Sequence, residues 1–358
     1  IRGGGSVLYD GAMGGIINIV RKKGIAGKGW TRPKISAQIG GEAFRSKKGN
    51  IGIKGGIGSL GYFVSGGFDL STGYLRNEQT KGYDLSGNLY YGLPLLKGQL
   101  SLSLKRHYTR ADYPVINDPA RSDYDPNYPI VLEGGDLVRK WSDNAYPGGV
   151  SYRYKKMDFL DLGYEQPVKK AKITMNLFGN MGDDTTYAYN CRLITKIDSV
   201  TGDTIVVPEL RQTVSVSNEY TYGASCRVKM SNINLNNFTF GADYRNLGTF
   251  PVEQETIMGV VIEPAWGYEA VPDWFRLVGI FGENEFKASS AINLTIGVRW
   301  SYLDEWTMPT YKNTVTGDSG RTHFYYKALL PKFSASYTFP DSMIIYTSVN
   351  RDWHVPNC

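Results

Sequence analysis

The sequence predicts an all-β fold, a transmembrane antiparallel β-barrel of which this chain holds roughly 12 to 13 strands. Three observations predict it. Apolar and polar residues alternate with a period of two, in segments of about ten residues. The connections between these segments divide into tight turns and long polar loops. No stretch approaches the ~18 apolar residues that a spanning helix needs, so helical spans are excluded.

The alternation is clearest in residues 97–105. One set of alternate positions is apolar and the other is polar, because successive side chains of a strand point to opposite faces. The apolar set there is Leu100, Leu102 and Leu104. The same division recurs in segments that begin at Ile35, Ala171, Phe238 and Ile292. Less regular strands are expected near Ile53, Val64, Leu89, Leu160, Val278, Phe333 and Ile345.

The connections have unequal lengths. Tight turns are expected at residues 55–61 and 93–98. Long loops are expected at about residues 110–149, 182–211, 248–273 and 305–326, and Asp183 and Asp184 then fall in a polar turn. Outer-membrane barrels have short periplasmic turns and long external loops, whereas such long loops are uncommon in compact soluble domains. This asymmetry favours a barrel over a soluble β-sandwich.

Composition argues against several other classes of protein. The formal net charge is +6, but Lys and Arg are spread along the chain, so no nucleic-acid partner is expected. The glycine-rich opening lacks a following Gly-Lys-Ser/Thr, which argues against a nucleotide loop.

Metal-binding and catalytic patterns are not evident either. The histidines lie far apart at His107, His323 and His354, so no metal site is expected. The sequence predicts no catalytic residues, no cofactor and no enzymatic activity. Cys191 and Cys226 are left open as a pair that an oxidising compartment would allow.

The opening residues carry a dense motif of fixed identities at fixed spacing. An Arg-Gly turn, a Ser-x-Leu-Tyr step, a Gly-Ala-x-Gly-Gly turn and an Ile-Asn-Ile strand follow in order. This run resembles the end of the plug domain of TonB-dependent outer-membrane receptors, although Gly4 stands where many members have proline. The motif residues are Arg2, Gly3, Ser6, Leu8, Tyr9, Gly11, Ala12, Gly14, Gly15 and Asn18.

The resemblance continues beyond this motif. Residues 277–300 and 330–357 also look like barrel segments of this family. It implies that residues 1–24 end a plug domain and that residues 25–358 form the N-terminal part of a barrel. Because family barrels have about 22 strands around a plugged lumen, the complete protein should have more strands, and a signal and TonB-contact segment upstream. Arg2 and Ser6 would then contact acidic luminal residues such as Asp243, or lie in a solvated turn.

Function follows from the resemblance as an expectation. It implies TonB-dependent import across the outer membrane of a Gram-negative bacterium, with the inner-membrane TonB complex and outer-membrane lipid as partners and a ferric siderophore as the leading cargo. The loop at residues 110–149 is rich in rings and cations, which suit an anionic chelate; the alternative is a mobile lid or a loop that faces lipopolysaccharide. Its candidate ligand contacts are Tyr113, Arg121, Tyr124, Tyr128, Arg139, Lys140 and Trp141.

Two alternatives stay open. A glycan or cobalamin importer would have the same architecture, and a glycan importer would add a surface lipoprotein as partner. A non-transport, β-rich surface binding module would share much of the strand pattern. Extraction of the full-length protein without detergent would favour that module over a barrel.

Overall fold

The computed structural model describes residues 30–42, 45–115, 117–120, 124–131, 151–197, 202, 204–233, 235–257, 260–262, 273–307, 322–340 and 343–351. Its strands form one antiparallel sheet in which neighbours in sequence are neighbours in space, except that β10 pairs only with β9 and β11 continues the sheet from β9. The described strands therefore form a simple up-and-down meander, as expected for a part of a barrel.

The strands are long. They are β1 (Trp30–Glu42), β2 (Ser46–Ile57), β3 (Leu60–Ser71), β4 (Thr80–Leu93), β5 (Gly98–Asp112), β6 (Tyr152–Val168), β7 (Ala171–Ile197), β8 (Thr204–Ile233), β9 (Asn236–Ile257), β10 (Val260–Ile262), β11 (Asp273–Lys287), β12 (Ile292–Thr307), β13 (Thr322–Thr338) and β14 (Ile344–Asn350). No helix in this described part is long and apolar enough to cross a membrane.

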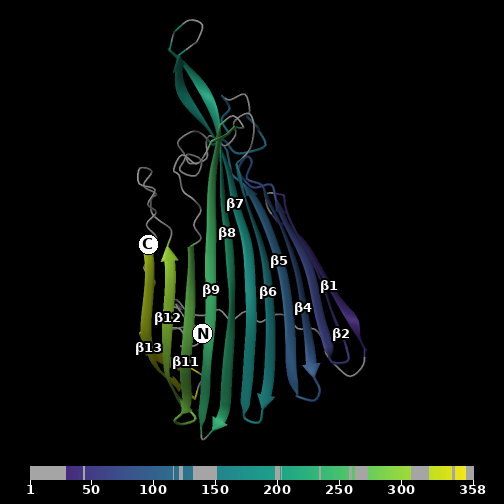
Figure 1. Ribbon diagram of the computed structural model, residues 1–358. Helices are drawn as coiled ribbons and strands as arrows, with labels where there is room; N and C mark the ends of the chain where they lie inside the picture. The colour runs from purple at the N-terminus through teal and green to yellow at the C-terminus, as the bar shows by residue number, and fades with distance from the viewer. Residues whose placement is uncertain are drawn as a thin grey trace.

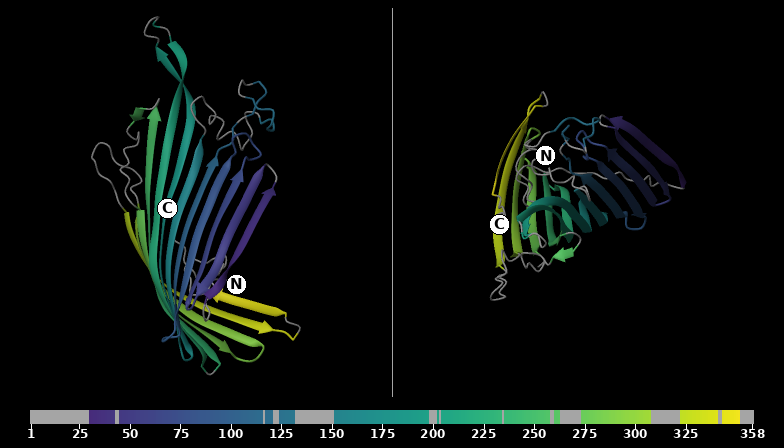
Figure 2. Two further views of the ribbon diagram at one scale, coloured as in Figure 1. Left: turned by 90° about the vertical axis from the view of Figure 1, so that its right-hand side faces the viewer. Right: turned by 90° about the horizontal axis from the view of Figure 1, so that it is seen from above.

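The sheet is curved and open. The strands run side by side in Figure 1, and the view from above in Figure 2 shows them bending around one side as a trough. β1 and β14 are the two ends of the described pairing order, and no pairing joins them within the described residues. The predicted fold class, a partial antiparallel barrel of roughly 12 to 13 strands, is confirmed.

The two faces of the sheet differ in chemistry. One face carries large apolar side chains that stay exposed, such as Ile35 (68%) and Leu177 (57%). The opposite face carries buried polar side chains, among them Asn88, Ser103 and Ser301. Curvature crowds side chains on the concave side, so we assign the buried polar face to the lumen and the exposed apolar face to lipid. We call these the luminal face and the outer face.

Apolar residues on the outer face form a band that climbs across the sheet. On β12 the band runs from Ile292 to Tyr302 and ends at Asp304, and on β3 it runs from Leu60 to Leu70. Each stretch has about the 9–11 residues that a tilted transmembrane strand needs. Leu60 is the lower end of the band on β3, and the pairing from strand to strand places it level with Trp300 on β12. Trp300 is eight residues beyond Ile292, the lower end of the band on β12. The band therefore shifts by about eight residues between these strands, as strand tilt in a barrel requires.

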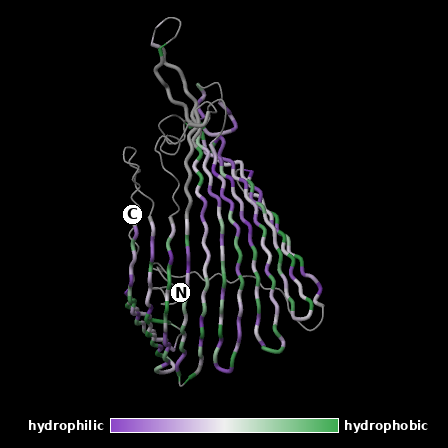
Figure 3. The backbone as a smooth tube through the Cα atoms, viewed as in Figure 1, coloured by the Kyte–Doolittle hydropathy of each residue, from purple (hydrophilic) through white to green (hydrophobic). Residues whose placement is uncertain are grey.

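Rings and charges mark the upper limit of the band on the central strands. Arg106 and Asp158 form a two-point ion pair on the outer face, with Nε–Oδ1 2.6 Å and Nη2–Oδ2 2.8 Å. Just above it, Tyr83 stacks on Tyr108 with ring centroids 4.9 Å apart, and Tyr108 stacks on Tyr154. Aromatic girdles of this kind mark membrane interfaces. Figure 3 shows hydrophilic residues gathering toward the upper ends of the central strands.

Strands β7 and β8 extend well beyond the band, which corrects the expected loop at residues 182–211. Pairing between them continues to Ile197 and Thr204, and Figure 1 shows the hairpin projecting above its neighbours. Asp183 and Asp184 consequently lie within β7 and not in a turn. The expected loop at 248–273 is also shorter, since β9 continues to Ile257. Outside the membrane both faces of a strand meet water, so the apolar alternation that reveals a strand is lost.

The strand register also decides whether Cys191 and Cys226 can form a disulfide bond. Cys226 is a free thiol that pairs in register with Met175 of β7, whereas Cys191 pairs with Leu210, 16 positions further along the same hairpin. At ~3.3 Å per residue these two levels are about 50 Å apart, far beyond the ~7 Å between Cα atoms that a disulfide tolerates. A bond between Cys191 and Cys226 is therefore excluded.

Candidate functional site

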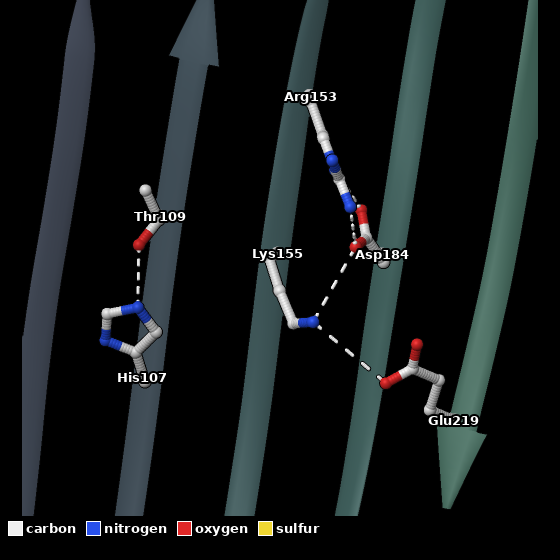
Figure 4. Close-up of polar contacts among 6 residues, drawn as sticks. All are labelled: His107, Thr109, Arg153, Lys155, Asp184 and Glu219. Carbon is white, nitrogen blue, oxygen red and sulfur yellow. Dashed lines mark hydrogen bonds and ion pairs between the residues drawn. The ribbon is translucent and has the colours of Figure 1, made fainter. Parts of the chain in front are cut away.

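Charged side chains gather on the luminal face above the apolar band, where β6, β7 and β8 run together. Arg153 on β6 donates from Nε to Oδ1 of Asp184 on β7 at 2.6 Å, and its Nη2 makes a second contact with Oδ2. Lys155 lies opposite Asp184 in register, with its Nζ 3.7 Å from Oδ2. The same ammonium is 4.0 Å from a carboxylate oxygen of Glu219 on β8. Figure 4 shows these side chains linked across three strands.

The members of this cluster differ in exposure. The Asp184 side chain is only 9% exposed, whereas that of Arg153 is 53% exposed and reaches the lumen. The hydrogen bond from Arg153 holds the pKa of Asp184 below its ordinary value, although partial burial of the carboxyl opposes this shift. Asp184 therefore stays ionised and fixes a guanidinium that remains accessible from the lumen.

A second polar group continues the cluster onto β5 and β4. His107 Nδ1 lies 2.8 Å from Oδ1 of Asp84, its partner in register, and Nε2 lies 2.7 Å from Oγ1 of Thr109. Lys105 Nζ also approaches Asp84, at 3.7 Å. Figure 4 shows the imidazole and Thr109 on the same side of the sheet as Arg153. The imidazole is oriented by two neighbours and faces the lumen.

Below these groups, the luminal face contains a cavity of about 800 Å³. Three phenylalanines project onto the otherwise polar face here, Phe63, Phe159 and Phe178. Phe178 fits because its partner in register is Gly223, where an added Cβ would lie 2.6 Å from the ring. The lining also includes leucines, a glycine and a set of hydroxyl, amide and charged side chains, namely Asp84, Ser86, Asn88, Ser103, Lys105, Asp161, Asn180, Thr221 and Arg245. Rings beside polar groups can hold an amphipathic ligand.

The luminal wall at β9 to β13 is built differently. Arg299 is 1% exposed and donates from Nη1 and Nη2 to both oxygens of Asp243, at 2.8 Å each. Its Nε donates to Ser301 at 2.9 Å. Nearby, Lys332 Nζ lies 3.8 Å from Glu283, and both side chains are more than nine-tenths buried. Asp243, which the sequence offered as a contact for Arg2 and Ser6, is thus engaged by Arg299, while Arg2 and Ser6 lie outside the described residues.

The loop that follows β5 contains part of the predicted ligand surface. Asn117 is 1% exposed and holds the loop together: its Nδ2 donates to the carbonyl of Asp125 at 2.8 Å and its Oδ1 accepts from the Asp125 amide at 3.0 Å. The Tyr113 amide donates to the Ser151 carbonyl at 2.9 Å, which ties the loop to the start of β6. A fixed base therefore supports this loop.

The predicted ligand contacts are described only in part. Tyr113, Tyr124 and Tyr128 are each half-buried, and so remain accessible. Arg121, Arg139, Lys140 and Trp141 lie outside the described residues, as do all the predicted motif residues of 1–24. The sequence analysis missed Arg153, Lys155 and Asp184. The alternation on β6 and β7 could have revealed them, because they occupy the positions between the apolar residues of these strands. For Asp184, the loop expected at residues 182–211 concealed that pattern.

In the part of the chain that the structure describes, no three His, Cys, Asp or Glu side chains lie close enough to hold a metal ion. His323 Nε2 lies 2.5 Å from Oδ1 of Asp304 on the outer face, and His354 is outside the described residues. The luminal wall thus offers charge and hydrogen bonding to a passing ligand.

Comparison with solved structures shows the fold. The structure described as copper transporter OprC is 12% identical, with a TM-score of 0.70, and the match covers 100% of this chain and 52% of that one. The ferripyoverdine receptor of the outer membrane of Pseudomonas aeruginosa, bound to ferripyoverdine, is 13% identical, with a TM-score of 0.63 and coverage of 95% and 44%. The siderophore receptor PiuA from Acinetobacter baumannii is 12% identical, with a TM-score of 0.61 and coverage of 97% and 52%.

These matches leave part of each solved structure uncovered. The chain spans about half the length of the solved structures it matches. Among curated protein sequences, none matches this chain.

A family comparison based on sequence agrees with the fold. The family described as "TonB dependent receptor-like, beta-barrel" matches residues 143–357, which is more than half of the chain. That match contains β6 to β14, which include the strands of Arg153, Lys155, Asp184 and Glu219. The chain therefore belongs to the TonB-dependent receptor family and contains a part of its β-barrel.

Proposed function

We propose that the complete protein imports a scarce nutrient across the outer membrane of a Gram-negative bacterium, driven by the TonB complex, and that its cargo is a ferric siderophore. The observation that carries this proposal is the contrast between the two faces of the sheet: an apolar outer face for lipid and a luminal wall with accessible Arg153, Lys155 and His107. Guanidinium and ammonium groups bind carboxylate and catecholate oxygens with charge assistance.

The N-terminal residues have a part in this proposal. We propose that residues 1–24 end a plug that blocks the lumen and that the barrel begins with the residues that follow. Ligand binding at the outer end would shift the plug toward a state in which TonB can engage it. The polar luminal wall supports this view, because a wall facing a protein plug or water must offer hydrogen bonds.

The cargo is tested by uptake into cells that have TonB, with and without the complete receptor. Labelled ferric siderophore, cobalamin and oligosaccharide are supplied in parallel. We expect deletion of the receptor to abolish uptake of the ferric siderophore only. If uptake of cobalamin or oligosaccharide needed the receptor instead, that ligand would be the cargo. If deletion of the receptor reduced uptake of none of the three ligands, the import proposal would be contradicted.

A luminal variant links the uptake to the described site. Arg153→Gln removes the accessible charge but keeps a side chain that can hydrogen bond to Asp184. We expect ferric siderophore binding to weaken about tenfold, since a charge-assisted bond contributes about 1.5–3 kcal/mol. The matched control is Arg106→Gln on the outer face, which should leave binding unchanged because that pair faces lipid. Equal binding by both variants would remove Arg153 from the ligand path.

A glycan importer is the second candidate, favoured by the luminal cavity that combines Phe63, Phe159 and Phe178 with amide and hydroxyl groups. Aromatic faces stack on sugar rings, and amides bind their hydroxyls. Under this candidate a surface lipoprotein would bind the receptor. Co-purification of such a lipoprotein with the complete receptor, together with receptor-dependent oligosaccharide uptake, would support it over the siderophore.

A further inference from the structure

Aromatic rings form a row on the outer face, at the upper limit of the apolar band on β11, β12 and β13. Trp274, Trp306 and His323 are partners in register on these three strands. The ring centroids of Trp274 and Trp306 are 6.0 Å apart, and those of Trp306 and His323 are 4.4 Å apart. The row lies two positions beyond Asp304, where the band on β12 ends. It therefore lies at a membrane interface.

The connections between these strands show which leaflet the row faces. At the end with the row, β12 and β13 are joined by the 14 residues 308–321. At the other end, β11 and β12 are joined by the four residues 288–291. Outer-membrane barrels have their long connections outside and their short turns in the periplasm. The row of rings is therefore level with the external leaflet.

Two cations accompany the rings on the outer face. Cζ of Arg276 on β11 lies 4.3 Å from the centroid of the Trp274 ring. Nζ of Lys327 on β13 lies 5.9 Å from the centroid of the Tyr302 ring. Both cationic residues are exposed, and neither makes an ion pair with a carboxylate among the residues that the structure describes. Both charges are accessible to a ligand from the membrane.

An acidic side chain separates the two cations. Asp304 lies on β12, the strand between them, in register with Arg276, and its Oδ1 is 2.5 Å from Nε2 of His323. Lys327 is two register positions lower on β13, so the Cα atoms of Arg276 and Lys327 are about 12 Å apart by strand spacing and rise. A single anion midway would be repelled by the Asp304 carboxylate. The arrangement fits two anionic groups, one at each cation.

The aromatic girdle on β4 to β7 has a different balance of charge. There, Arg106 pairs with Asp158 at 2.6 Å, and Lys156 pairs with Asp183 at 3.7 Å. The rings of that girdle therefore lie beside neutral pairs, which need no counter-charge from the membrane. The patch on β11 to β13 has two cations that an anionic lipid surface would stabilise.

We propose that Arg276 and Lys327 bind the two phosphates of a lipopolysaccharide headgroup in the external leaflet. The external leaflet of an outer membrane is built from this lipid, whose disaccharide carries one phosphate at each end. Guanidinium binds phosphate with two hydrogen bonds, and ammonium binds it as a point charge. The acyl chains lie along Ile280 and Leu329 below, which are 55% and 57% exposed. This inference requires a barrel in the outer membrane and is independent of the cargo.

The test measures lipid binding to the complete receptor, freed of lipid in detergent, by native mass spectrometry. The probes are lipid A with two phosphates, lipid A with one phosphate, and phosphatidylglycerol. We expect lipid A with two phosphates to bind about fivefold more tightly than either probe with one phosphate, because each cation beside an anionic lipid contributes about fivefold. Equal binding of the three probes would overturn the proposal, since any anionic lipid would then suffice.

Variants assign the binding to the two cations. R276Q/K327Q should weaken binding of lipid A with two phosphates at least about tenfold and should abolish the preference for the second phosphate. R276K/K327R keeps both charges and should keep that preference. The matched control R106Q/K156Q removes two cations that already have carboxylate partners, and should bind as the parent does.

Heat-modifiable gel mobility shows whether each variant is a folded barrel, and the comparison of probes on the parent protein needs no variant. A folded R276Q/K327Q that kept the parent's preference for two phosphates would overturn the proposal. An equal loss in R106Q/K156Q would also overturn it, because the binding would then depend on the total charge of the outer face.

Discussion

The ring of Phe68 on β3 occupies the space where a side chain of Gly49 on β2 would begin. The two residues are partners in register, and an added Cβ at Gly49 would lie 2.5 Å from Cε1 and 2.7 Å from Cζ of the ring. Gly55 and Tyr62 repeat the arrangement on the same two strands, with an added Cβ 2.5 Å from the tyrosine oxygen. Rings that cover glycines shield the backbone and fix the register between strands.

Gly49→Ala should therefore destabilise the barrel. The ring of Phe68 must move aside, and because this ring is 44% exposed on the outer face, the cost should be at the lower end of that for overpacking, about 1 kcal/mol. The free energy of unfolding of the complete receptor, measured in urea with lipid present, checks this value. Gly87→Ala on β4 is the control, because nothing lies within 4 Å of an added Cβ there. Adding Phe68→Leu to Gly49→Ala should recover most of the loss; equal stability of the two alanine variants would contradict the fit.

Asp243→Asn should cost more than a typical luminal substitution. Arg299 is 1% exposed and relies on both oxygens of Asp243, so the variant leaves a buried cation without its counter-charge. Breaking a buried pair in this way costs about 3–5 kcal/mol. The double variant Asp243→Asn with Arg299→Met should regain most of the stability, because it removes the buried charge as well. Urea unfolding of the parent, the single variant and the double variant measures these changes in stability. A double variant no more stable than the single variant would refute this account.

Much of the fold could be predicted because the membrane imposes a pattern on each strand separately. Hydrocarbon on one side and a polar lumen on the other force alternation at Leu100, Leu102 and Leu104, and every strand assigned in that way is present. The hairpin of β7 and β8 was missed above the membrane, where nothing forces alternation. The rest of β8 was not predicted as a strand either, although Tyr220, Tyr222 and Ala224 occupy alternate positions there. Strand boundaries can be read from the sequence only where the surroundings of the two faces differ.

The site was harder to predict, because its contacts join residues on different strands. The pairs Arg153 with Asp184 and Arg299 with Asp243 are 31 and 56 residues apart in the chain. They meet because the register brings β6 level with β7, and brings β12 level with β9 across Gly279 of β11, and the sequence of one strand does not specify that register. The loop tyrosines were predicted from residue type, whereas Asn117, which organises their loop, has no distinguishing sequence pattern. Tyr113, Tyr124 and Tyr128 remain predictions as ligand contacts.

Leu102→Arg should impair barrel assembly, because Leu102 lies on the outer face between Leu89 and Leu162. A charge placed near the bilayer midplane costs about 2–4 kcal/mol. The luminal neighbour Ser101→Arg carries the same side chain on the opposite face and should assemble normally. The fraction of heat-modifiable receptor in the outer membrane measures assembly. Normal assembly of Leu102→Arg would mean that the two faces are assigned the wrong way round.

Asp184→Asn should make the barrel less stable at neutral pH and should remove part of its sensitivity to acid. In the parent, Arg153 lowers the pKa of Asp184 below the unfolded value of about 3.9. The ionised carboxylate therefore stabilises the fold above that value, and its contribution is lost as the pH falls through the lower pKa of the folded state. At pH 7 the variant should lose on the order of 1 kcal/mol, discounted because Arg153 is half exposed.

The adjacent residue supplies a matched control for this pH dependence. Asp183 faces outward and pairs with Lys156 at 3.7 Å, with both side chains 40% exposed, so solvent weakens the pair. Asp183→Asn should then change stability little at any pH. Urea unfolding of both variants between pH 3 and 8 measures the difference, which should shrink below pH 4 for Asp184→Asn. Equal losses for the two variants would show that burial of Asp184 and its bond to Arg153 do not set its contribution.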